Sequence, residues 1–309
     1  MSSRLVSEVS QLRIQPSLFT IILGDFGREA ATRYAGLLAA EERRHIAAIL
    51  ASKDLPFLDE YRRVMFSLVG DVAFLKTEMI DAAWEGSSRL SDRVLVAVRG
   101  NPVPLELIQR LALVIHDEAA GAAARGHTDV RVSLVCNALS DVLQQAIDLA
   151  VGPELETIAS RFGYELRRTT SPMPSIAAHG VVQACLSEIS HRGLCTGRPV
   201  LVLGAKMARE LYAKWGNARG VETIEITAEQ QSVIDDAVVL AIDGREAGLL
   251  QARQAIEHSV VAPHRRTDPD LIVLEACTDF DFGIGYDSIR LMASALVRDA
   301  YTPRSPLGV

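Results

Sequence analysis

Short apolar runs, each followed by a longer stretch with helical spacing, are the feature of this sequence that most limits its fold. The runs end in small or polar residues, as strands do where a turn leads into a helix. They are predicted as strands at residues 19–23, 93–98, 130–135, 199–203, 221–226 and 271–276. Strands that are apolar throughout and alternate with helices are typical of a parallel sheet covered on both faces. The sequence therefore predicts an α/β fold built from mostly parallel sheets flanked by helices.

The two halves of the chain repeat one another faintly. TIILG at 20–24 and LVLG at 201–204 both end a predicted strand with glycine, and both precede a helix that contains an Arg and a Tyr. VSLVCN at 132–137 and VLEACT at 273–278 both carry a cysteine at the end of a later strand. We interpret the repeat as two pseudo-symmetric α/β lobes, each a mostly parallel sheet flanked by helices, with the active site in the cleft between them.

The repeat divides the chain into unequal parts. Residues 1–171 are predicted to form the N-terminal lobe, 172–284 the second α/β lobe, and 285–309 a C-terminal segment that returns to the first lobe. The first lobe is longer because residues at about 45–92 have no counterpart in the second. Their pattern predicts an inserted helical segment between the first helix and the second strand.

Composition and charge exclude several classes of protein. Hydrophobic residues make up 49% of the chain and charged residues 23%, which is typical of a globular protein and too apolar for a disordered one. The net charge is −7 and no basic patch stands out, so no nucleic-acid partner is expected. No apolar run approaches the ~18 residues of a membrane helix, and the first residues lack the apolar core of a secretory signal. We expect a cytoplasmic protein with no membrane partner.

The chain has four cysteines, at positions 136, 185, 195 and 277. They are too few for a disulfide scaffold and form no CxxC or CxH pair, so neither a disulfide framework nor a zinc site is expected. Cys185 and Cys195 lie in and just after a predicted helix, where a small buried side chain is the default interpretation. Cys136 and Cys277 each follow a predicted strand, at the carboxyl end where parallel sheets bind their ligands.

One strand-end cysteine from each half suggests acid–base chemistry across a cleft. Racemisation of a carbon next to a carboxylate needs a base on one face of that carbon and an acid on the other. A cysteine, with an unperturbed pKa of ~8.5, can take either role near neutral pH. Helix N-termini favour the thiolate, and we expect both Cys136 and Cys277 to lie at such ends. The alternative is that each is a buried strand-end residue with no chemical role.

Motifs in the right order resemble the aspartate/glutamate racemase superfamily, most of all its cofactor-independent aspartate racemase branch. That branch opens with a GGMGPxAT loop, where this chain has GDFGREAA at 24–31. Its first catalytic motif, CNTxH, corresponds to CNALS at 136–140, and its second, GCTE, corresponds to ACTD at 276–279. The resemblance covers most of the chain, from about residue 19 to about residue 281.

The resemblance implies a racemase, an isomerase that needs neither pyridoxal phosphate nor a metal and acts on aspartate or glutamate. It implies Cys136 and Cys277 as the two acid/base residues and a homodimer as the assembled form. The residues that would contact the substrate are Gly24, Asp25, Phe26, Arg99, Asn137, Lys206 and Thr278. Asn137 and Thr278 would hold the α-carboxylate, and Arg99 and Lys206 are candidates for anion binding. Asp25 and Asp279 are candidates to assist proton transfer, the alternative role of each being a helix cap.

Departures from the family pattern put the substrate in question. Ala138 and Ser140 stand where the family has threonine and histidine. Ala205 and Lys206, before the helix with Tyr212, stand where it has threonines. Losing a hydroxyl donor weakens carboxylate binding by ~1–3 kcal/mol, and the charge of Lys206 could compensate. Two alternatives therefore stay open: a non-catalytic or regulatory protein that binds small carboxylates, and a related isomerase or decarboxylase of small carboxylic acids.

Overall fold

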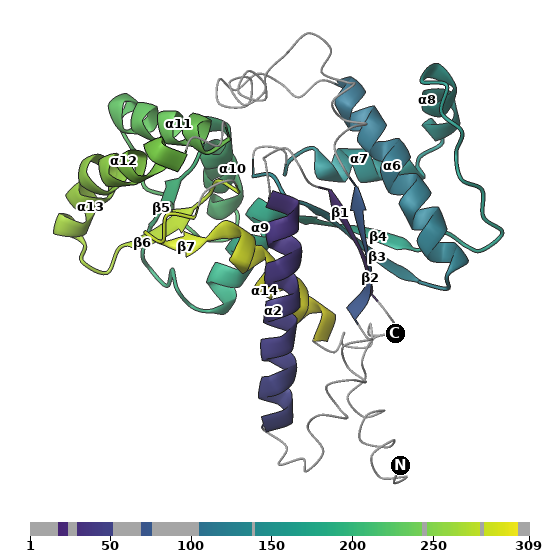
Figure 1. The fold of residues 1–309 in the computed structure, drawn as a ribbon, viewed down its shortest axis with the longest axis horizontal. Coiled ribbons are helices and arrows are strands. Elements are labelled where there is room, and N and C mark those ends of the chain that lie inside the picture. The colour runs from purple at the N-terminus through teal and green to yellow at the C-terminus, as the bar shows by residue number, and fades with distance from the viewer. Residues whose placement is uncertain are drawn as a thin grey trace.

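The computed structural model describes residues 18–23, 30–51, 69–75, 105–137, 140–242, 246–278 and 281–301. Within these residues the chain forms a four-stranded sheet with strand order β2-β1-β3-β4 and a three-stranded sheet with order β5-β6-β7 (Figure 1). Each strand pair among them is parallel. The expected α/β fold, with parallel sheets flanked by helices, is confirmed.

The strands are β1 (Leu18–Leu23), β2 (Val69–Leu75), β3 (Asp129–Leu134), β4 (Ser175–Gly180), β5 (Val200–Leu203), β6 (Ile272–Glu275) and β7 (Tyr286–Asp287). Strands β1, β3, β5 and β6 lie where apolar runs predicted them. The run at 93–98 lies outside the described residues, and the run at 221–226 contributes a bridge between Val200 and Thr223. Strands β4 and β7 were not predicted, because β4 is mostly accessible to solvent and β7 has only 2 residues.

The helices are α2 (Ala30–Ala51), α6 (Leu105–Ala124), α7 (Leu143–Val151), α8 (Leu155–Arg161), α9 (Val181–His191), α10 (Lys206–Asn217), α11 (Ala228–Ile242), α12 (Glu246–Ile256), the π-helix η2 (Glu257–Val261), α13 (Ala262–Thr267) and α14 (Ser288–Tyr301). The sequence predicts a helix after β1, one on either side of β3 and one after β5. The structure has these helices as α2, α6, α7 and α10. The helix predicted around Cys185 is present as α9. Within the described residues, none of the helices has both the length and the apolarity that crossing a membrane requires.

The sequence predicts an inserted helical segment at about 45–92. This prediction is wrong at Val69–Leu75, the part of that range that the structure describes after α2. Helix α2 runs to Ala51, and Val69–Leu75 forms β2, which pairs in parallel with β1. A short apolar run can be helix or strand by its pattern alone. Here the backbone of β1 supplies the hydrogen-bond partners that make it a strand. Residues 52–68 and 76–92 lie outside the described residues.

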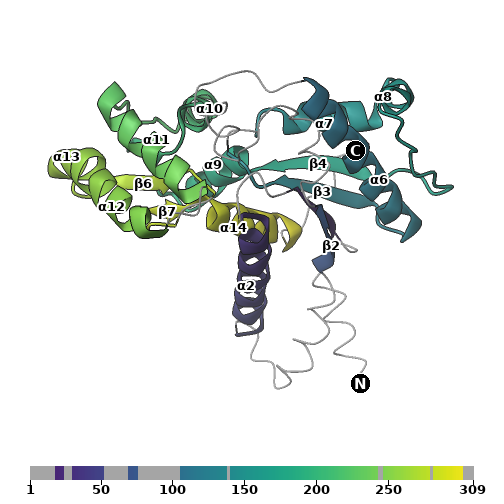
Figure 2. The same cartoon turned by 45° about the horizontal axis from the view of Figure 1, so that its top comes forward.

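Strands β1, β3, β5 and β6 are largely buried on both faces, which explains why most of their residues are apolar. In β1, Phe19 and Ile21 pack under α6 and α7, whereas Ile22 joins a core shared by α2, α9, α10 and α14. In β5, Leu201 packs against α11 and α12, whereas Val200 points into the same shared core. The alternation follows from the two-residue period of a strand. Figures 1 and 2 show α9 and α14 between the two sheets.

The first sheet takes in residues on both sides of the predicted boundary between 171 and 172. Strand β4 lies beyond that boundary and pairs with β3 along its length, from Asp129 opposite Ser175 to Leu134 opposite Gly180. In the predicted C-terminal segment, α14 packs against α2 and α9, in the helix layer between the sheets.

Candidate active site

Cys136 lies in a turn that leaves the carboxyl end of β3. The N–H of Val135 still donates to the Leu23 carbonyl of β1, at 3.0 Å. The Cys136 carbonyl accepts a hydrogen bond from the Ser140 hydroxyl at 3.2 Å, and the same hydroxyl accepts one from the N–H of Val182 at 3.4 Å. Ser140, which stands in place of the family's histidine, therefore ties the Cys136 turn to the first turn of α9.

Asn137, the next residue, reaches across to elements that follow the first sheet. Its side-chain carbonyl accepts a hydrogen bond from the Tyr212 hydroxyl of α10 at 2.8 Å. Its amide N–H donates to the Ser288 hydroxyl of α14 at 3.4 Å. All three residues are buried. The resemblance implied that Asn137 holds a substrate carboxylate. That role stays a prediction, and in the structure both ends of the amide have protein partners.

Cys277 follows the carboxyl end of β6, which lies beside the end of β5. The N–H of Ala276 donates to the Leu203 carbonyl at 2.7 Å, so the strand pairing continues up to the cysteine. At Gly204 a Cβ would lie 2.8 Å from the Ala276 carbonyl oxygen, so only glycine fits at this close approach. Cys277 and Thr278 are both buried, with Cys277 in the core that β5 and β6 share with α11 and α12.

A buried carboxylate holds the loop that follows Cys277. Glu275, the last residue of β6, is fully buried. It accepts hydrogen bonds from the backbone N–H groups of Phe282 at 2.8 Å, Ile284 at 2.6 Å and Gly285 at 2.9 Å. Sequence reasoning missed this residue. The available signal was an acidic residue at the end of an apolar run, because a buried strand retains a charge only where hydrogen bonds satisfy it.

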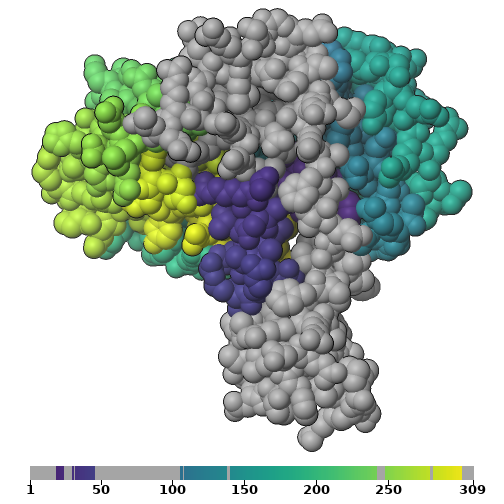
Figure 3. Space-filling model, viewed as in Figure 1, coloured from purple at the N-terminus to yellow at the C-terminus, as the bar shows by residue number. Residues whose placement is uncertain are grey.

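Arg33 of α2 joins the first lobe to the same segment. Its guanidinium lies 2.9 Å from a carboxylate oxygen of Asp281 and 2.6 Å from one of Asp287. The other Asp287 oxygen accepts from the N–H of Ile289 at 3.0 Å, at the start of α14. Burial raises the pKa of Asp287, and the charge of Arg33 partly offsets that rise. Figure 3 shows α2, in purple, beside the yellow C-terminal residues.

Four helices begin near the carboxyl ends of the strands. Helix α2 follows β1, α9 directly follows β4, α10 follows β5 and α14 directly follows β7. Helix N-termini carry partial positive charge, so this region favours carboxylates and thiolates. The expectation that both cysteines themselves lie at helix starts is wrong. After Cys136 the next helix begins at Leu143, and after Cys277 the next begins at Ser288, because a turn and a loop intervene.

Lys206 is the first residue of α10, with a side chain that is 59% exposed and lies 3.9 Å from Glu210, one turn along the helix. Together with Arg209 and Glu225 it lines a hollow of about 570 Å³ beside β5. Its backbone N–H donates to the Asp235 carboxylate of α11. That contact occupies one of the N–H groups with which a helix start binds an anion. The anion-binding role of Lys206 stays a prediction.

The remaining predicted site residues, Gly24, Asp25, Phe26, Arg99 and Asp279, lie outside the described residues. Their roles as substrate contacts and proton helpers stay predictions. Among the residues that the structure does describe, no group of three or more His, Cys, Asp and Glu side chains could hold a metal ion.

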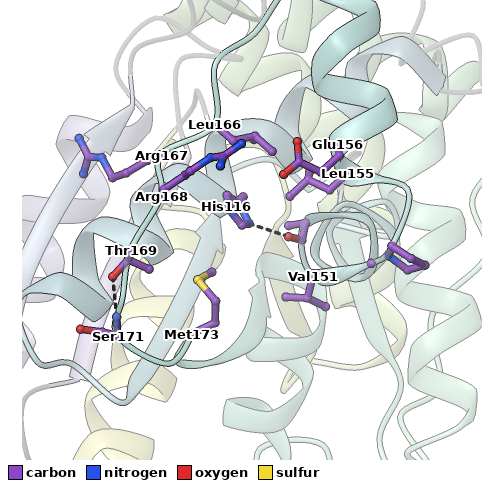
Figure 4. A pocket seen from close by; sticks show the side chains of 13 residues that line it. His116, Val151, Leu155, Glu156, Leu166, Arg167, Arg168, Thr169, Ser171 and Met173 are labelled. Atoms are coloured by element: carbon purple, nitrogen blue, oxygen red, sulfur yellow. Dashed lines mark hydrogen bonds between the residues drawn. The ribbon is translucent and has the colours of Figure 1, made fainter.

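A separate cavity of about 580 Å³ lies on the outer side of the first lobe (Figure 4). Helix α6 contributes His116, whose Nδ1 lies 3.0 Å from the Ala150 carbonyl oxygen. Arg168 and Met173 come from the segment between α8 and β4. None of the predicted site residues that the structure describes lines this cavity, so it is distinct from the strand-end region.

Comparison with known proteins identifies the fold. A scan against protein-family models and a search of curated proteins both find no match. Among solved structures, a candidate Asp/Glu racemase from Yersinia pestis matches with a TM-score of 0.51 at 12% identity, over 92% of this chain and 100% of that chain. The two chains share one fold. At that identity the likeness establishes the racemase fold and not a reaction.

Two further solved structures resemble this chain. An aspartate racemase homologue from Pyrococcus horikoshii OT3 has a TM-score of 0.48 at 14% identity, over 92% of this chain and 99% of that chain. An aspartate racemase from Picrophilus torridus has a TM-score of 0.46 at 14% identity, over 92% of this chain and 94% of that chain.

Proposed function

We propose that this chain is a cofactor-independent racemase that interconverts the enantiomers of an acidic amino acid, aspartate or glutamate. In this proposal Cys136 and Cys277 are the two acid/base residues. The observation that carries it is the link between the two strand ends. Asn137, next to Cys136, is hydrogen-bonded to Tyr212 of α10 and Ser288 of α14. These two helices follow β5 and β7, the neighbours in the sheet of β6, the strand that leads to Cys277. The racemase fold of the chain supports the same type of reaction.

The reaction removes a proton from one face of the substrate α-carbon and adds one at the other. A thiolate takes the Cα proton, and the electron pair left on carbon is delocalised into the α-carboxylate. The thiol of the opposite cysteine then gives its proton to the carbon and inverts the configuration. The first cysteine ends as a thiol and the second as a thiolate, so protons and charge balance without a cofactor.

The environment of the strand ends supports this chemistry. The N-termini of α2, α9, α10 and α14 favour both a thiolate and the carboxylates of the substrate. The Cα–H bond of an amino acid is a weak acid, so groups already in place must stabilise the charge that develops. Cys277 and Thr278 are buried, which keeps water from part of this region.

The other predicted roles belong to the same proposal. Gly24, Asp25, Phe26, Arg99, Asn137, Lys206 and Thr278 are proposed to contact the substrate, and Asp25 and Asp279 to assist the cysteines. The assembled form is proposed to be a homodimer, which sedimentation of the purified protein would check.

Isotope exchange tests the proposed reaction. Incubation with L-aspartate, and separately with L-glutamate, in deuterated water is expected to give the D-enantiomer with deuterium at Cα. During early turnover the remaining L-substrate should keep its protium, because a different cysteine acts on each face. Chiral chromatography with mass spectrometry measures both species.

Two cysteine variants and one control make the test specific. Cys136→Ser and Cys277→Ser are each expected to slow racemisation by at least about 10²-fold, since each removes one of the two proton-transfer groups. Cys195→Ser is the control, because Cys195 is a buried cysteine that follows α9 and has no proposed chemical role. Absence of exchange with either amino acid would contradict the proposal. Binding without exchange would favour a carboxylate-binding protein, and loss of CO2 from the substrate would favour a decarboxylase.

A further inference from the structure

Among the described residues, two tyrosines are fully buried in the core between the sheets, Tyr34 of α2 and Tyr212 of α10. A buried hydroxyl needs a hydrogen-bond partner, and the two have different ones. The Tyr34 hydroxyl lies 3.3 Å from the Ser133 hydroxyl, within β3. The Tyr212 hydroxyl donates to the side-chain carbonyl of Asn137 at 2.8 Å. The second contact therefore reaches the turn that holds Cys136.

The Tyr212 contact belongs to a polar network inside an otherwise apolar core. Asn137 also donates to the Ser288 hydroxyl, and the Ser288 carbonyl accepts a hydrogen bond from the Cys185 thiol at 3.1 Å. Burial raises the pKa of Tyr212 and of Cys185, so both groups stay protonated and able to donate. The network joins four parts of the fold: the turn after β3, and helices α9, α10 and α14.

We propose that Tyr212, acting through Asn137, is a positioning residue for Cys136. It holds the turn after β3 against α10 and α14, and so sets the place of the Cys136 thiol relative to the second lobe. The peptide plane between Cys136 and Asn137 is rigid, so a shift of the Asn137 side chain is passed to its neighbour. The effect on turnover rests on the proposed racemase function, whereas the link from Tyr212 to the Cys136 turn does not.

In the structure the Asn137 amide already has a protein partner at each end, so a substrate contact would be added to these hydrogen bonds. If Asn137 turned toward a ligand, the buried Tyr212 hydroxyl would lose its carbonyl partner, which is costly inside a core. The turn is also held from its other side, where Ser140 contacts the Cys136 carbonyl and the N–H of Val182. Cys136 thus lies between two anchors, one on α9 and one on α10 and α14.

Proton transfer depends steeply on where the thiol lies. Misplacing a reacting group by about 1 Å can cost ~10²-fold in rate. Tyr212 is fully buried and is proposed to act on the thiol rather than on the substrate. Its loss should therefore lower kcat much more than it changes KM.

A pair of matched variants tests the positioning role. Tyr212→Phe removes the hydroxyl that contacts Asn137. Tyr34→Phe removes the same atom from an equally buried tyrosine of the same core. Two measurements are made on the unmodified chain and on both variants. The first is the pH dependence of iodoacetamide alkylation at Cys136, followed by peptide mass spectrometry. The second is kcat and KM for racemisation.

The two variants are expected to differ in their effect at Cys136. Both should lose some thermal stability, because each loses the hydrogen bonds of a buried hydroxyl, which for Tyr212 include one with the Cys185 thiol. Tyr212→Phe is expected to change Cys136 alkylation several-fold and to lower kcat by roughly tenfold or more, with little change in KM. Tyr34→Phe is expected to show the same Cys136 alkylation and the same kcat as the unmodified chain.

The outcomes separate this proposal from the proposed function. If the unmodified protein racemises nothing, the function fails, and the alkylation comparison still decides whether Tyr212 holds the Cys136 turn. Tyr212 is not a positioning residue if Tyr212→Phe leaves alkylation and kcat unchanged, or if Tyr34→Phe changes them equally. If Tyr212→Phe fails to fold, Ser288→Ala replaces it in the test, because it removes the other hydrogen-bond partner of the Asn137 side chain. Ser288→Ala is then expected to change the alkylation of Cys136. Unchanged alkylation would overturn the proposal.

Discussion

Glu275 illustrates how one buried side chain shapes a whole loop. Its two carboxylate oxygens accept hydrogen bonds from the backbone N–H groups of Phe282, Ile284 and Gly285. Hydrogen bonds to a charged acceptor are stronger than neutral ones, and together they offset the cost of burying the charge. Gly285 passes so close to β6 that a Cβ there would lie 2.3 Å from the Val273 carbonyl oxygen. The Glu275 carboxylate therefore holds the loop after Cys277, and Gly285 lets that loop pass close to β6.

Removing the Glu275 carboxylate should destabilise the protein strongly. Glu275→Ala is expected to lower the free energy of unfolding by ~3–5 kcal/mol, because it leaves buried N–H groups without their acceptor. Glu275→Gln keeps one acceptor oxygen and should lose less. Urea unfolding followed by circular dichroism measures both variants. Glu165→Ala is the control, since Glu165 is exposed and should change stability by ~0.5 kcal/mol or less. A Glu275→Ala loss no larger than the control's would show that the carboxylate does not hold the loop.

Pairs of elements are joined by polar contacts as well as by apolar packing. Arg33 connects α2 to Asp281 and Asp287, on the segment that leads into α14. His179 of β4 places its Nε2 2.9 Å from the Met292 carbonyl of α14. The His179 contact joins α14 to β4 of the first sheet, and the Arg33 contacts join the segment before α14 to α2. Burial lowers the pKa of His179, so the neutral imidazole is the form that the fold prefers.

The His179 contact predicts a loss of stability in mild acid. The pKa of His179 in the folded state lies below its unfolded value of ~6.5, so the unfolded chain takes up the proton first. The stabilisation is therefore present above the unfolded pKa and is lost as the pH falls through it. Unfolding by urea at about pH 7, about pH 6 and about pH 5 is expected to show a decline.

A glutamine variant isolates the contribution of His179. Glutamine can donate to the Met292 carbonyl without titrating, so His179→Gln should decline less between about pH 7 and about pH 5 than the unmodified chain. His45, whose pKa burial also lowers, remains in both proteins and contributes equally. An identical decline in both proteins would assign the pH dependence to other groups.

At the scale of the whole molecule, the described residues form two sheets around one shared layer of helices. The core between the sheets includes Ile22 and Val135 from the first sheet and its edge, and Val202 and Leu274 from the second. Helices α2, α9, α10 and α14 contribute to this same core. Neither sheet can therefore keep its inner face buried when the other unfolds.

The shared core predicts that both lobes unfold together. Pulsed hydrogen exchange across a urea series should show peptides from β1 and β3 losing protection at the same urea concentration as peptides from β5 and β6. Mass spectrometry of the peptides provides the measurement. Two separated midpoints would show that each lobe has an independent core.

Local composition was enough to predict much of the framework. Strands β1, β3, β5 and β6 are buried on both faces, and such strands are recognisable as apolar runs. The placement of Cys136 and Cys277 after two of those strands follows from the same pattern. Strand β2 was misjudged and β4 and β7 were missed, because their strand conformation comes from pairing with a neighbour rather than from their own residues.

The contacts that join the lobes were decided by the tertiary structure. Tyr212 and Asn137 lie 75 residues apart in the sequence, and Arg33 and Asp287 lie 254 apart. The hydrogen bonds that Glu275 accepts likewise depend on the path of a loop folded back onto β6. Helical and strand periodicity report which face of an element is buried, because burial follows local hydrophobicity. They do not report which polar groups meet there, since that depends on how distant elements pack.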